Sequence, residues 1–549
     1  MSQANLLQRL NSWQNHWRVM RMARQIAAHA GPEASKPTIA FFCASARLGG
    51  LSQNAAFSLL AGWGLRLSGV AVKHFVCRSG MSHCILGTNR QDHHAPPPCS
   101  ACERQSRRMF QAADVHWFEY HPDPSLADSL KDLNVEQLCR FEAPISVSDS
   151  GEPSASIPLG RLVLPSIRWA LRRYTLSDDE DTRYLLRQYL LSAYNVANEF
   201  RAFLEDVKPS AAVIFNGILY PEASARWVAQ QRGLRVITHE VSFQRFSAFF
   251  SNGEATAYPI DIPEEFELTQ PQNARLNAYL EQRFQGKFTM AGIRFWPEMR
   301  GLDEAFLQKA SRFRQLVPIF TNVVYDTSQV HANQVFEHMF AWLDLVLDII
   351  RAHPETLFVI RAHPDEMRPG TAKQSRESVR QWVEQNGVAT LPNVVFIDSQ
   401  EYVSSYELIQ RAKFVCVYNS SIGMEAALMG VPVLCGGKAR FTQYPIVFFP
   451  ETPQDYRQDF ETFLAAAAIE APPEFERNAR RFLYYQLFRA SLGFENYLQD
   501  GGRKGYVQLK PFSWQALLPM NSPTIDVLVR GITGNEQRSQ ADFLLEDVI

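Results

Sequence analysis

The chain has 549 residues, of which 46% are hydrophobic and 20% are charged, and its formal net charge at pH 7 is −2. This composition is that of a globular protein, and the length exceeds what one hydrophobic core supports, so we expect two large domains. The small net charge excludes a general attraction to nucleic acid or to anionic lipid. No apolar run reaches the length of a membrane span and no export signal is evident, which predicts a cytoplasmic protein.

Residues 1–35 are predicted to form an amphipathic helix. The favoured interpretation is that its apolar face packs on the protein's own domain or on a partner, because apolar helical stripes are usually core. The alternative is peripheral association with the inner face of the membrane, where basic helices with tryptophan can lie. The apolar positions recur at spacings of three and four residues, with arginines between them, and are Leu6, Leu10, Trp13, Trp17 and Met20.

Residues 36–310 are predicted to form a first domain around a Rossmann-like sheet. An apolar strand is followed by a turn at Gly49 and Gly50 and by an apolar-rich helix from Asn54 to Leu67. A strand–helix–strand unit lies further along, with proline at the start of its helix and glycine at the end, which is typical of a parallel sheet.

Four cysteines cluster in the loop 77–102 of this domain, spaced C-x6-C-x14-C-x2-C: Cys77, Cys84, Cys99 and Cys102. Four thiolates suit a structural zinc ion or an iron–sulfur cluster, and four protein ligands leave no open position for catalysis. The first spacing fits no standard zinc ribbon, so reduced cysteines in a long loop are the alternative. Disulfides are disfavoured in the cytosol.

His239 and Glu240 lie at the end of the last strand of the strand–helix–strand unit. Sites in doubly wound sheets lie at the carboxyl ends of strands, so we expect both side chains to face a cleft between the domains. Either group could take a proton from a hydroxyl group, which makes the pair candidates for a general base. A structural role is the alternative.

Residues 311–470 are predicted to form a second domain. Its first strand ends in the sequence TNVVYD, which places Asn322 and Asp326 at a strand end. Backbone amides at this turn could meet a phosphate group, and Asp326 could instead cap the next helix.

The main motif lies between Leu357 and Gly437, where two buried strands break into polar turns, RAHP and NSSIGMEAALMG. A helix beginning at two serines at the carboxyl end of a strand is a site for a phosphate. A guanidinium and an imidazole from the neighbouring strand end could donate to the same anion, and a carboxylate could accept from ribose hydroxyls. The candidates are Arg361, His363, Pro364, Ser420, Ser421 and Glu425. Considered one at a time, each residue has a structural alternative. The imidazole of His363 could hydrogen-bond only to the backbone, and Ser420 and Ser421 could only cap the following helix. Considered together, the residues favour a ligand site.

RAHP together with SSIGMEAALMGVPVLCGG resembles the carboxyl-terminal half of GT-B glycosyltransferases of the capsule polysaccharide biosynthesis type, which include the Kdo transferases of capsule assembly. The resemblance extends over about Leu316–Pro450. It implies an α/β fold of the GT-B class, two Rossmann-like doubly wound domains that face a cleft, with helices in residues 471–549 crossing back to the first domain.

The resemblance also implies a function. It predicts a glycosyltransferase that moves a sugar from a nucleotide-activated donor, such as a CMP-linked sugar, to a surface polysaccharide or glycolipid acceptor. From their positions at strand ends, the candidate catalytic residues are Glu240, His239 and Asp326. The candidate donor-binding residues are Arg361, His363, Pro364, Ser420, Ser421, Glu425, Asn322, Gly49 and Gly50, and the resemblance implies that the His and Ser residues of the motif hold the donor's phosphate. No DxD-like metal motif lies at a strand end, so no catalytic metal is predicted. The alternatives are a nucleotide-sugar 2-epimerase or glycerophosphotransferase of the same fold, and a non-catalytic scaffold of an envelope polysaccharide complex.

Overall fold

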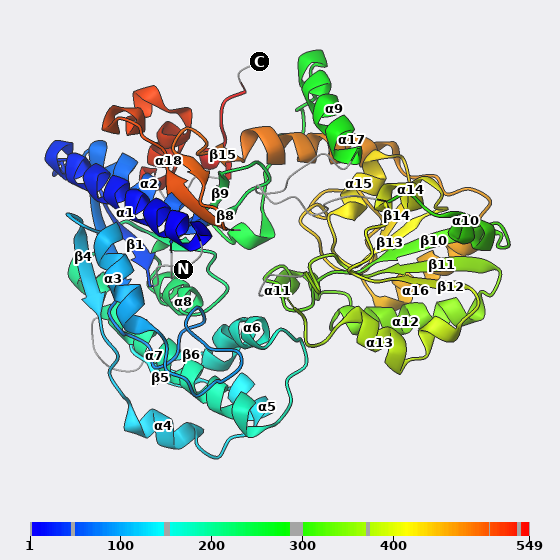
Figure 1. Cartoon of the computed structure of the whole chain (residues 1–549), viewed down its shortest axis with the longest axis horizontal. Helices are drawn as coiled ribbons and strands as arrows, with labels where there is room; N and C mark the ends of the chain where they lie inside the picture. The colour runs from blue at the N-terminus through cyan, green and yellow to red at the C-terminus, as the bar shows by residue number, and fades with distance from the viewer. Residues whose placement is uncertain are drawn as a thin grey trace.

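The computed structural model describes residues 3–44, 50–147, 154–285, 300–368, 374–503, 505–534 and 540–547. These residues form two α/β domains, each built on a mainly parallel sheet with helices on both faces (Figure 1). The first sheet has seven strands and the second has five. Two smaller sheets, of three and two strands, flank the first domain.

The first sheet has the strand order β15-β9-β8-β7-β1-β3-β4. Its strands β8, β7, β1, β3 and β4 are parallel. Near one edge, β9 pairs antiparallel with β8, and the edge strand β15 pairs antiparallel with β9. The bounds are β1 Thr38–Cys43, β3 Ala71–Cys77, β4 Asp114–Phe118, β7 Ala211–Phe215, β8 Arg235–Val241, β9 Ser247–Ser251 and β15 Leu492–Gly493. The smaller sheets are β2 Leu51–Ser52 with β16 Leu498–Asp500 and β17 Tyr506–Leu509, and β5 Ala143–Ile145 with β6 Ala155–Ile157.

Both faces of the first sheet are buried, as expected of parallel strands with near-continuous apolar sequences. In β1, Ile39 and Phe41 point into one core while Ala40 and Phe42 point into the other, because successive strand residues alternate between faces. One face is covered by α1 Gln3–His29, α2 Gln53–Leu67, α3 Cys99–Met109 and α18 Pro523–Thr533. The other is covered by α4 Pro124–Leu130, α5 Val135–Cys139, α6 Leu159–Leu171, α7 Glu180–Val207 and α8 Glu222–Gln231.

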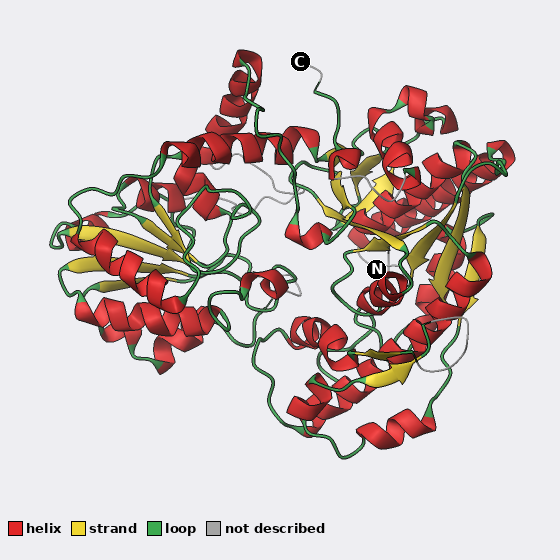
Figure 2. Ribbon diagram, turned by 180° about the vertical axis from the view of Figure 1, so that it is seen from behind, coloured by secondary structure: helices red, strands yellow, loops and turns green. Residues whose placement is uncertain are grey.

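The second sheet is entirely parallel, in the order β12-β11-β10-β13-β14, and lies between two helical layers (Figure 2). Its strands are β10 Gln315–Phe320, β11 Thr356–Arg361, β12 Val394–Ile397, β13 Val415–Val417 and β14 Val433–Cys435. One face packs on α11 Gln329–Ala332, α12 Met339–Ala352, α13 Val379–Gln385 and α16 Pro453–Ala465. The other packs on α9 Gln270–Phe284, α14 Ser405–Gln410, α15 Ile422–Leu428 and α17 Pro473–Tyr484, and α10 Glu304–Ala310 lies beside this layer.

The chain returns to the first domain after α17, which spans the space between the domains in Figure 1. A turn of π-helix at Tyr485–Arg489 follows, and β15 then joins the first sheet beside β9. The predicted GT-B class, with two Rossmann-like domains and carboxyl-terminal elements that cross back, is confirmed. In addition, α9 and α10 pack on the second domain although they precede residue 311 in the chain.

The amino-terminal helix α1 packs on the first domain, but not through the face predicted from the sequence. The buried positions are Val19, Met22, Ala23 and Ile26, whereas Trp13 is 66% exposed and Trp17 is 48% exposed. The packing face is set by a hydrogen bond from the backbone N–H of Leu509 to Asn15 and by one from Arg18 to the carbonyl of Leu509, near the other end of the chain. The side chains of residues 3–11 lie outside the described part. Among the described helices, none combines the length and the apolar character needed to cross a bilayer.

Candidate active site between the two domains

The carboxyl edge of the second sheet faces the first domain. Glu377, in the segment after β11, accepts a 2.6 Å hydrogen bond from the backbone N–H of Tyr174 in the first domain. His331, after β10, shares a 2.8 Å hydrogen bond between its Nε2 and Oγ1 of Thr256. The loops that carry the predicted donor-binding residues therefore lie at the domain boundary, where ligands bind in folds of this kind.

Glu240 is an acidic group on the first-domain side of this boundary, near Asp326 of the second domain. Its Oε2 accepts a hydrogen bond from Nδ2 of Asn216 at 2.7 Å, and its Oε1 accepts one from Nδ2 of Asn54 at 3.3 Å. Burial raises the pKa of Glu240, and the negative charge of Asp326 across the boundary adds a smaller increase. A carboxylate with a raised pKa, fixed by two amides, can serve as a general base near neutral pH.

His239 lies on the opposite face of the same strand and does not reach the boundary. It is fully buried, and its ring stacks on that of Phe250 with a centroid distance of 4.9 Å. Neither ring nitrogen has a hydrogen-bond partner among the described residues, and burial lowers the pKa of His239 to about 3. The prediction that His239 faces the cleft is therefore wrong, because neighbouring strand residues point to opposite faces.

Asn322 and Asp326 lie in the turn after β10, as predicted. Nδ2 of Asn322 donates to Oδ1 of Asn419 at 2.6 Å, which joins this turn to the one before α15. Asp326 is exposed, and its Oδ1 accepts a hydrogen bond from the backbone N–H of Thr327. Ser328, and not Asp326, holds the N-cap position of α11, so Asp326 is not the cap of that helix.

Arg361 does not point toward a ligand at the boundary. The side chain is buried, and its Nη1 donates to the carbonyl of Asp398 at 3.0 Å, which ties β11 to the turn after β12. Burial lowers the pKa of Arg361 to about 10. The structure does not support the phosphate contact predicted for Arg361, because its guanidinium donates to the protein backbone instead.

His363 and Pro364 begin the turn after β11. The Nδ1 atom of His363 accepts a 3.1 Å hydrogen bond from the backbone N–H of Asp365, which fixes the tautomer with the proton on Nε2. The imidazole is half-buried. One nitrogen is thus satisfied by the backbone, and the other is a hydrogen-bond donor.

Glu366, in the same turn, carries a buried carboxyl group whose charge should depend on pH. It is 1% exposed, and its Oε1 accepts a 2.8 Å hydrogen bond from the backbone N–H of Val379. Burial raises the pKa of Glu366 from 4.5 to about 8. The folded protein therefore keeps a proton that the unfolded chain has released, so stability should fall as pH rises from 4.5 to about 8.

We expect Glu366→Gln to remove this pH dependence while keeping the acceptor for Val379. The wild type should lose up to about 1.4 kcal/mol per pH unit relative to the variant within that window. Thermal unfolding of both proteins at pH 5, 7 and 8 measures it: the variant should match the wild type at pH 5 and melt at a higher temperature at pH 8. Parallel curves would contradict the expectation, and the exposed Glu384→Gln on α13 serves as the control.

Ser420 and Ser421 precede α15 at the carboxyl end of β13. Ser421 occupies the N-cap position, but its side chain makes no capping hydrogen bond, and Ser420 is 9% exposed. The explanation of Ser421 as a side-chain cap is therefore not supported. Both residues lie between the carboxyl end of β13 and the N-terminus of α15.

Glu425 is occupied by other partners within the second domain. Its Oε1 accepts a 2.5 Å hydrogen bond from Nη2 of Arg283 on α9, and its Oε2 accepts one of 2.5 Å from the hydroxyl of Tyr406. The carboxylate is 3% exposed. A contact with ribose, as predicted from the sequence, has no support, because both oxygens are engaged inside the domain.

The glycine turn after β1 is only partly visible. Gly49 lies outside the described residues. Gly50 has a φ of 156° and a Cβ there would lie 2.7 Å from the ring of Tyr506. This close approach to β17 accounts for the glycine without a ligand.

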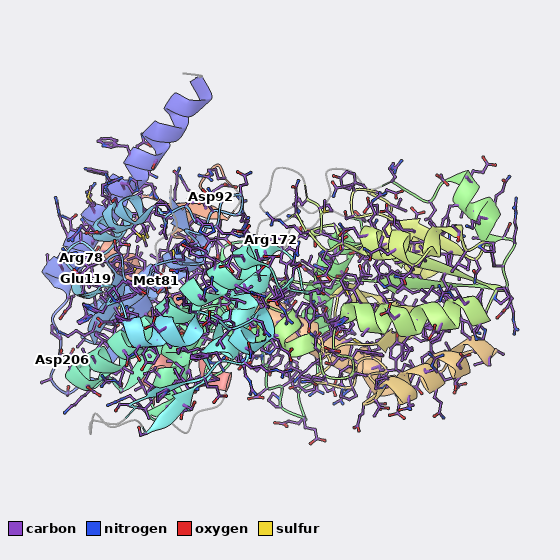
Figure 3. The ribbon with its side chains drawn as sticks, turned by 90° about the horizontal axis from the view of Figure 1, so that it is seen from below. Arg78, Met81, Asp92, Glu119, Arg172 and Asp206 are labelled. Carbon is purple, nitrogen blue, oxygen red and sulfur yellow. The ribbon has the colours of Figure 1, made fainter. Side chains whose placement is uncertain are left out.

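Arg172 is a candidate that sequence reasoning missed. It follows α6 in a left-handed conformation and is 3% exposed, with its guanidinium 4.1 Å from the ring centroid of Trp169 and 4.8 Å from that of Tyr325 in the second domain. Figure 3 shows it at the side of the first domain that faces the second. Its Nε and Nη1 have no hydrogen-bond partner among the described residues. Burial, and then the charge of Arg90, lower the pKa of Arg172 to about 10. A buried cation between aromatic rings is suited to an anionic ligand.

The four predicted cysteines lie away from this boundary, around one cavity of the first domain. All eight cysteines are in described residues, and none forms a disulfide. Within the described ranges, no group of three or more histidine, cysteine, aspartate or glutamate side chains is already arranged to hold a metal ion.

Comparisons with known proteins agree with the resemblance seen in the sequence. Residues 290–446 match the family model described as capsule polysaccharide biosynthesis protein, which confirms the resemblance for this part of the chain. No curated protein matches the chain.

Solved structures with a similar fold are distant. A β-Kdo 2,4-transferase, KpsC of Thermosulfurimonas dismutans, is 11% identical, with a TM-score of 0.34, 58% of this chain covered and 87% of that chain. The β-Kdo 2,7-transferase of the same KpsC is 13% identical, with a TM-score of 0.33 and coverages of 57% and 85%. The UDP-GlcNAc 2-epimerase of Neisseria meningitidis is 14% identical, with a TM-score of 0.24 and coverages of 82% and 99%.

Proposed function

We propose that this protein is a glycosyltransferase that moves a sugar from a nucleotide-activated donor to a surface polysaccharide or glycolipid acceptor. The observation that carries the proposal is the position of Glu240. This carboxylate, held by two asparagine amides, stands opposite the strand-end loops of the segment that matches the capsule polysaccharide family. A base on one domain and a phosphate site on the other are the two parts that sugar transfer requires.

The donor binds to the second domain in this proposal. Its phosphate lies at the N-terminus of α15 near the hydroxyls of Ser420 and Ser421, and Nε2–H of His363 donates to it. Arg172 supplies a positive charge from the first domain. These groups neutralise the charge that develops on the leaving nucleotide. A CMP-linked sugar such as Kdo is the donor class that we favour, because the RAHP and SSIGMEAALMG motifs resemble those of the capsular Kdo transferases.

The transfer is a single displacement. The acceptor hydroxyl oxygen forms a bond to the anomeric carbon while the bond from that carbon to the phosphate oxygen breaks, and the nucleotide leaves with the electron pair. Glu240 takes the hydroxyl proton on Oε1 or Oε2. The proton transfer alone accounts for about 10²–10⁴ of the rate enhancement.

Peripheral membrane association belongs to the same proposal. Trp13 and Trp17 are exposed on α1, and Arg21 stacks on Trp17 with a distance of 5.3 Å from Cζ to the ring centroid. A helix that shows tryptophan and arginine to solvent can bind at an anionic membrane surface, where a lipid-linked acceptor is presented.

Calorimetric titration with CMP, CDP, UDP, GDP and TDP tests the donor site. We expect one nucleotide to bind, and His363→Ala and Ser420→Ala to weaken that binding by roughly tenfold each, as one lost charge-assisted hydrogen bond does. Ser311→Ala, at the end of α10, is the matched control. No binding by a well-folded wild type would overturn the transferase proposal in favour of a scaffold. Conversion of donor without acceptor into an epimer would identify a 2-epimerase.

Arg172→Met gives a separate test of the anion site. We expect it to weaken nucleotide binding by about 10- to 100-fold, while the melting temperature of the unliganded protein stays the same or rises because a buried unpaired charge is removed. Arg173→Ala, at the neighbouring half-buried arginine, should change neither quantity. Unchanged binding together with a lower melting temperature would assign Arg172 a structural role instead.

A further inference from the structure

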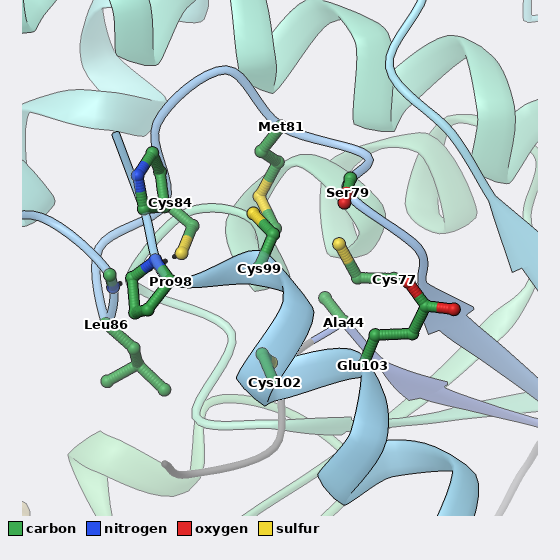
Figure 4. A pocket seen from close by; sticks show the side chains of 12 residues that line it. Ala44, Cys77, Ser79, Met81, Cys84, Leu86, Pro98, Cys99, Cys102 and Glu103 are labelled. Atoms are coloured by element: carbon green, nitrogen blue, oxygen red, sulfur yellow. Dashed lines mark hydrogen bonds between the residues drawn. The ribbon is translucent and has the colours of Figure 1, made fainter. Parts of the chain in front are cut away.

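The four cysteines of the loop 77–102 surround a single cavity of about 30 Å³. Cys77 is the last residue of β3, Cys84 lies in the loop that follows, and Cys99 and Cys102 lie on the first turn of α3 (Figure 4). Residues from three separate parts of the chain thus bring four sulfur atoms to one place. The remaining four cysteines do not line this cavity.

Two of the sulfurs receive backbone hydrogen bonds of the same kind. The N–H of Gly80 donates to Sγ of Cys77 at 3.2 Å, and the N–H of Gly87 donates to Sγ of Cys84 at 3.2 Å. Both pairs have the sequence Cys-x-x-Gly. Backbone donors aimed at sulfur can stabilise a metal-bound thiolate, although burial outweighs them in the protein without metal and raises the pKa of both thiols.

Glycine is required at both donor positions. A Cβ on Gly87 would lie 2.9 Å from Sγ of Cys84 and 2.8 Å from Cβ of Pro97. A Cβ on Gly80 would overlap the ring of Phe118. The close approach of the peptide to each sulfur therefore depends on these two glycines.

The other two sulfurs lie at the N-terminus of α3. Cys99 and Cys102 are three residues apart and so share one face of the helix, in its first turn. The cavity wall between the sulfurs is apolar, with Met81, Leu86 and Pro98 among its lining residues. Such a shell limits the access of water.

We propose that these four cysteines hold a metal centre, either a zinc ion or an iron–sulfur cluster. Each cysteine binds through its thiolate, and its proton passes to solvent as the metal enters. A single zinc ion needs all four sulfurs at about 2.3 Å from one point, and no group in the described part of the chain is yet so arranged. A cluster spans more space and uses the same four thiolates. With every position filled by protein, the centre is structural.

The segment between Cys84 and Cys99, which the metal centre would hold in place, reaches the domain boundary. Thr88 and the hydroxyl of Tyr189 share a 2.7 Å hydrogen bond, and the carbonyl of Arg90 accepts a 2.9 Å hydrogen bond from Arg376 of the second domain. The guanidinium of Arg90 lies 5.0 Å from the ring centroid of Trp169, on which Arg172 also stacks. The metal centre therefore supports the loop beside the proposed anion site without touching the ligand.

The experiment is metal analysis of the full chain, purified without oxygen, and it needs no transferase activity. We expect either about one zinc ion per chain or, with acid-labile sulfide and visible charge-transfer absorption, about four iron ions. The double variant Cys99→Ser/Cys102→Ser should lose the metal, whereas Cys139→Ser, on α5 and outside the cavity, should keep it. Metal retained at the wild-type level by the double variant would overturn the proposal.

If the double variant does not fold, cysteine alkylation of the wild-type protein tests the same proposal. With metal bound, iodoacetamide should leave Cys77, Cys84, Cys99 and Cys102 unmodified, and removal of the metal by a chelator or an oxidant should expose all four together. Protein that carries no metal and takes up none when incubated with Zn²⁺, or with Fe²⁺ and sulfide under reducing conditions, would also overturn the proposal.

Discussion

Replacing Glu240 by glutamine is expected to lower the rate constant of sugar transfer by about 10²–10⁴-fold, the contribution of a general base. Glutamine keeps the shape of the side chain, and its one amide oxygen can still accept from Asn54 and from the backbone N–H of Val241, so the fold and the donor site should be preserved although the hydrogen bond from Asn216 is lost. The affinity for the nucleotide should change by no more than about twofold, because the base acts on the acceptor and not on the donor. Steady-state kinetics and calorimetry with the same preparation measure the two effects.

Asp326→Asn distinguishes Glu240 from the other carboxylate at the boundary. The charge of Asp326 contributes to the raised pKa of Glu240, so its removal should lower that pKa. Activity needs ionised Glu240 and is lost as pH falls through this pKa, so the acid limb of the pH–rate profile should move to lower pH in the variant. A loss of activity in Asp326→Asn as large as in Glu240→Gln would instead assign the base role to Asp326.

The positions of the strand-end loops could be predicted from the sequence, but the direction of each side chain could not. Alternating apolar runs and turn residues place His239 and Glu240 at the end of a strand, as the structure does. Which of two neighbours faces the boundary depends on how β8 pairs with β7, where Phe215 lies beside His239. The sequence around these residues carries no signal for that choice.

The roles of the charged residues of the motif could not be predicted from the sequence, because their hydrogen-bond partners come from distant parts of the chain. The guanidinium of Arg361 donates to the backbone carbonyl of Asp398. The carboxylate of Glu425 accepts from Arg283, which lies 142 positions earlier in the sequence. Arg172 was missed for the same reason: its neighbours Trp169 and Tyr325 belong to different domains. Local sequence patterns describe the strand and the turn, and tertiary contacts decide which charges remain for a ligand.

Breaking the buried ion pair between Arg283 and Glu425 is expected to cause the largest loss of stability. Both side chains are almost fully buried, at 3% exposure each. Burial acts to lower the pKa of Arg283, but the charge of Glu425 outweighs it and raises that pKa, so the guanidinium is charged. Arg283→Met leaves the carboxylate of Glu425 buried without its cation, which costs about 3–5 kcal/mol. The melting temperature should fall by roughly 6–20 °C.

The triple variant Arg283→Met/Glu425→Leu/Tyr406→Phe is the matched comparison, because it also removes the carboxylate and the hydroxyl that donates to it. Replacing a whole buried ion pair by apolar groups is often neutral or stabilising, so the triple variant should recover most of the loss. Glu425 lies in α15, whose N-terminus forms the proposed phosphate site. If Glu425 only positions this helix, the triple variant should also recover nucleotide binding. If Glu425 instead binds ribose, the triple variant should recover thermal stability but not nucleotide binding.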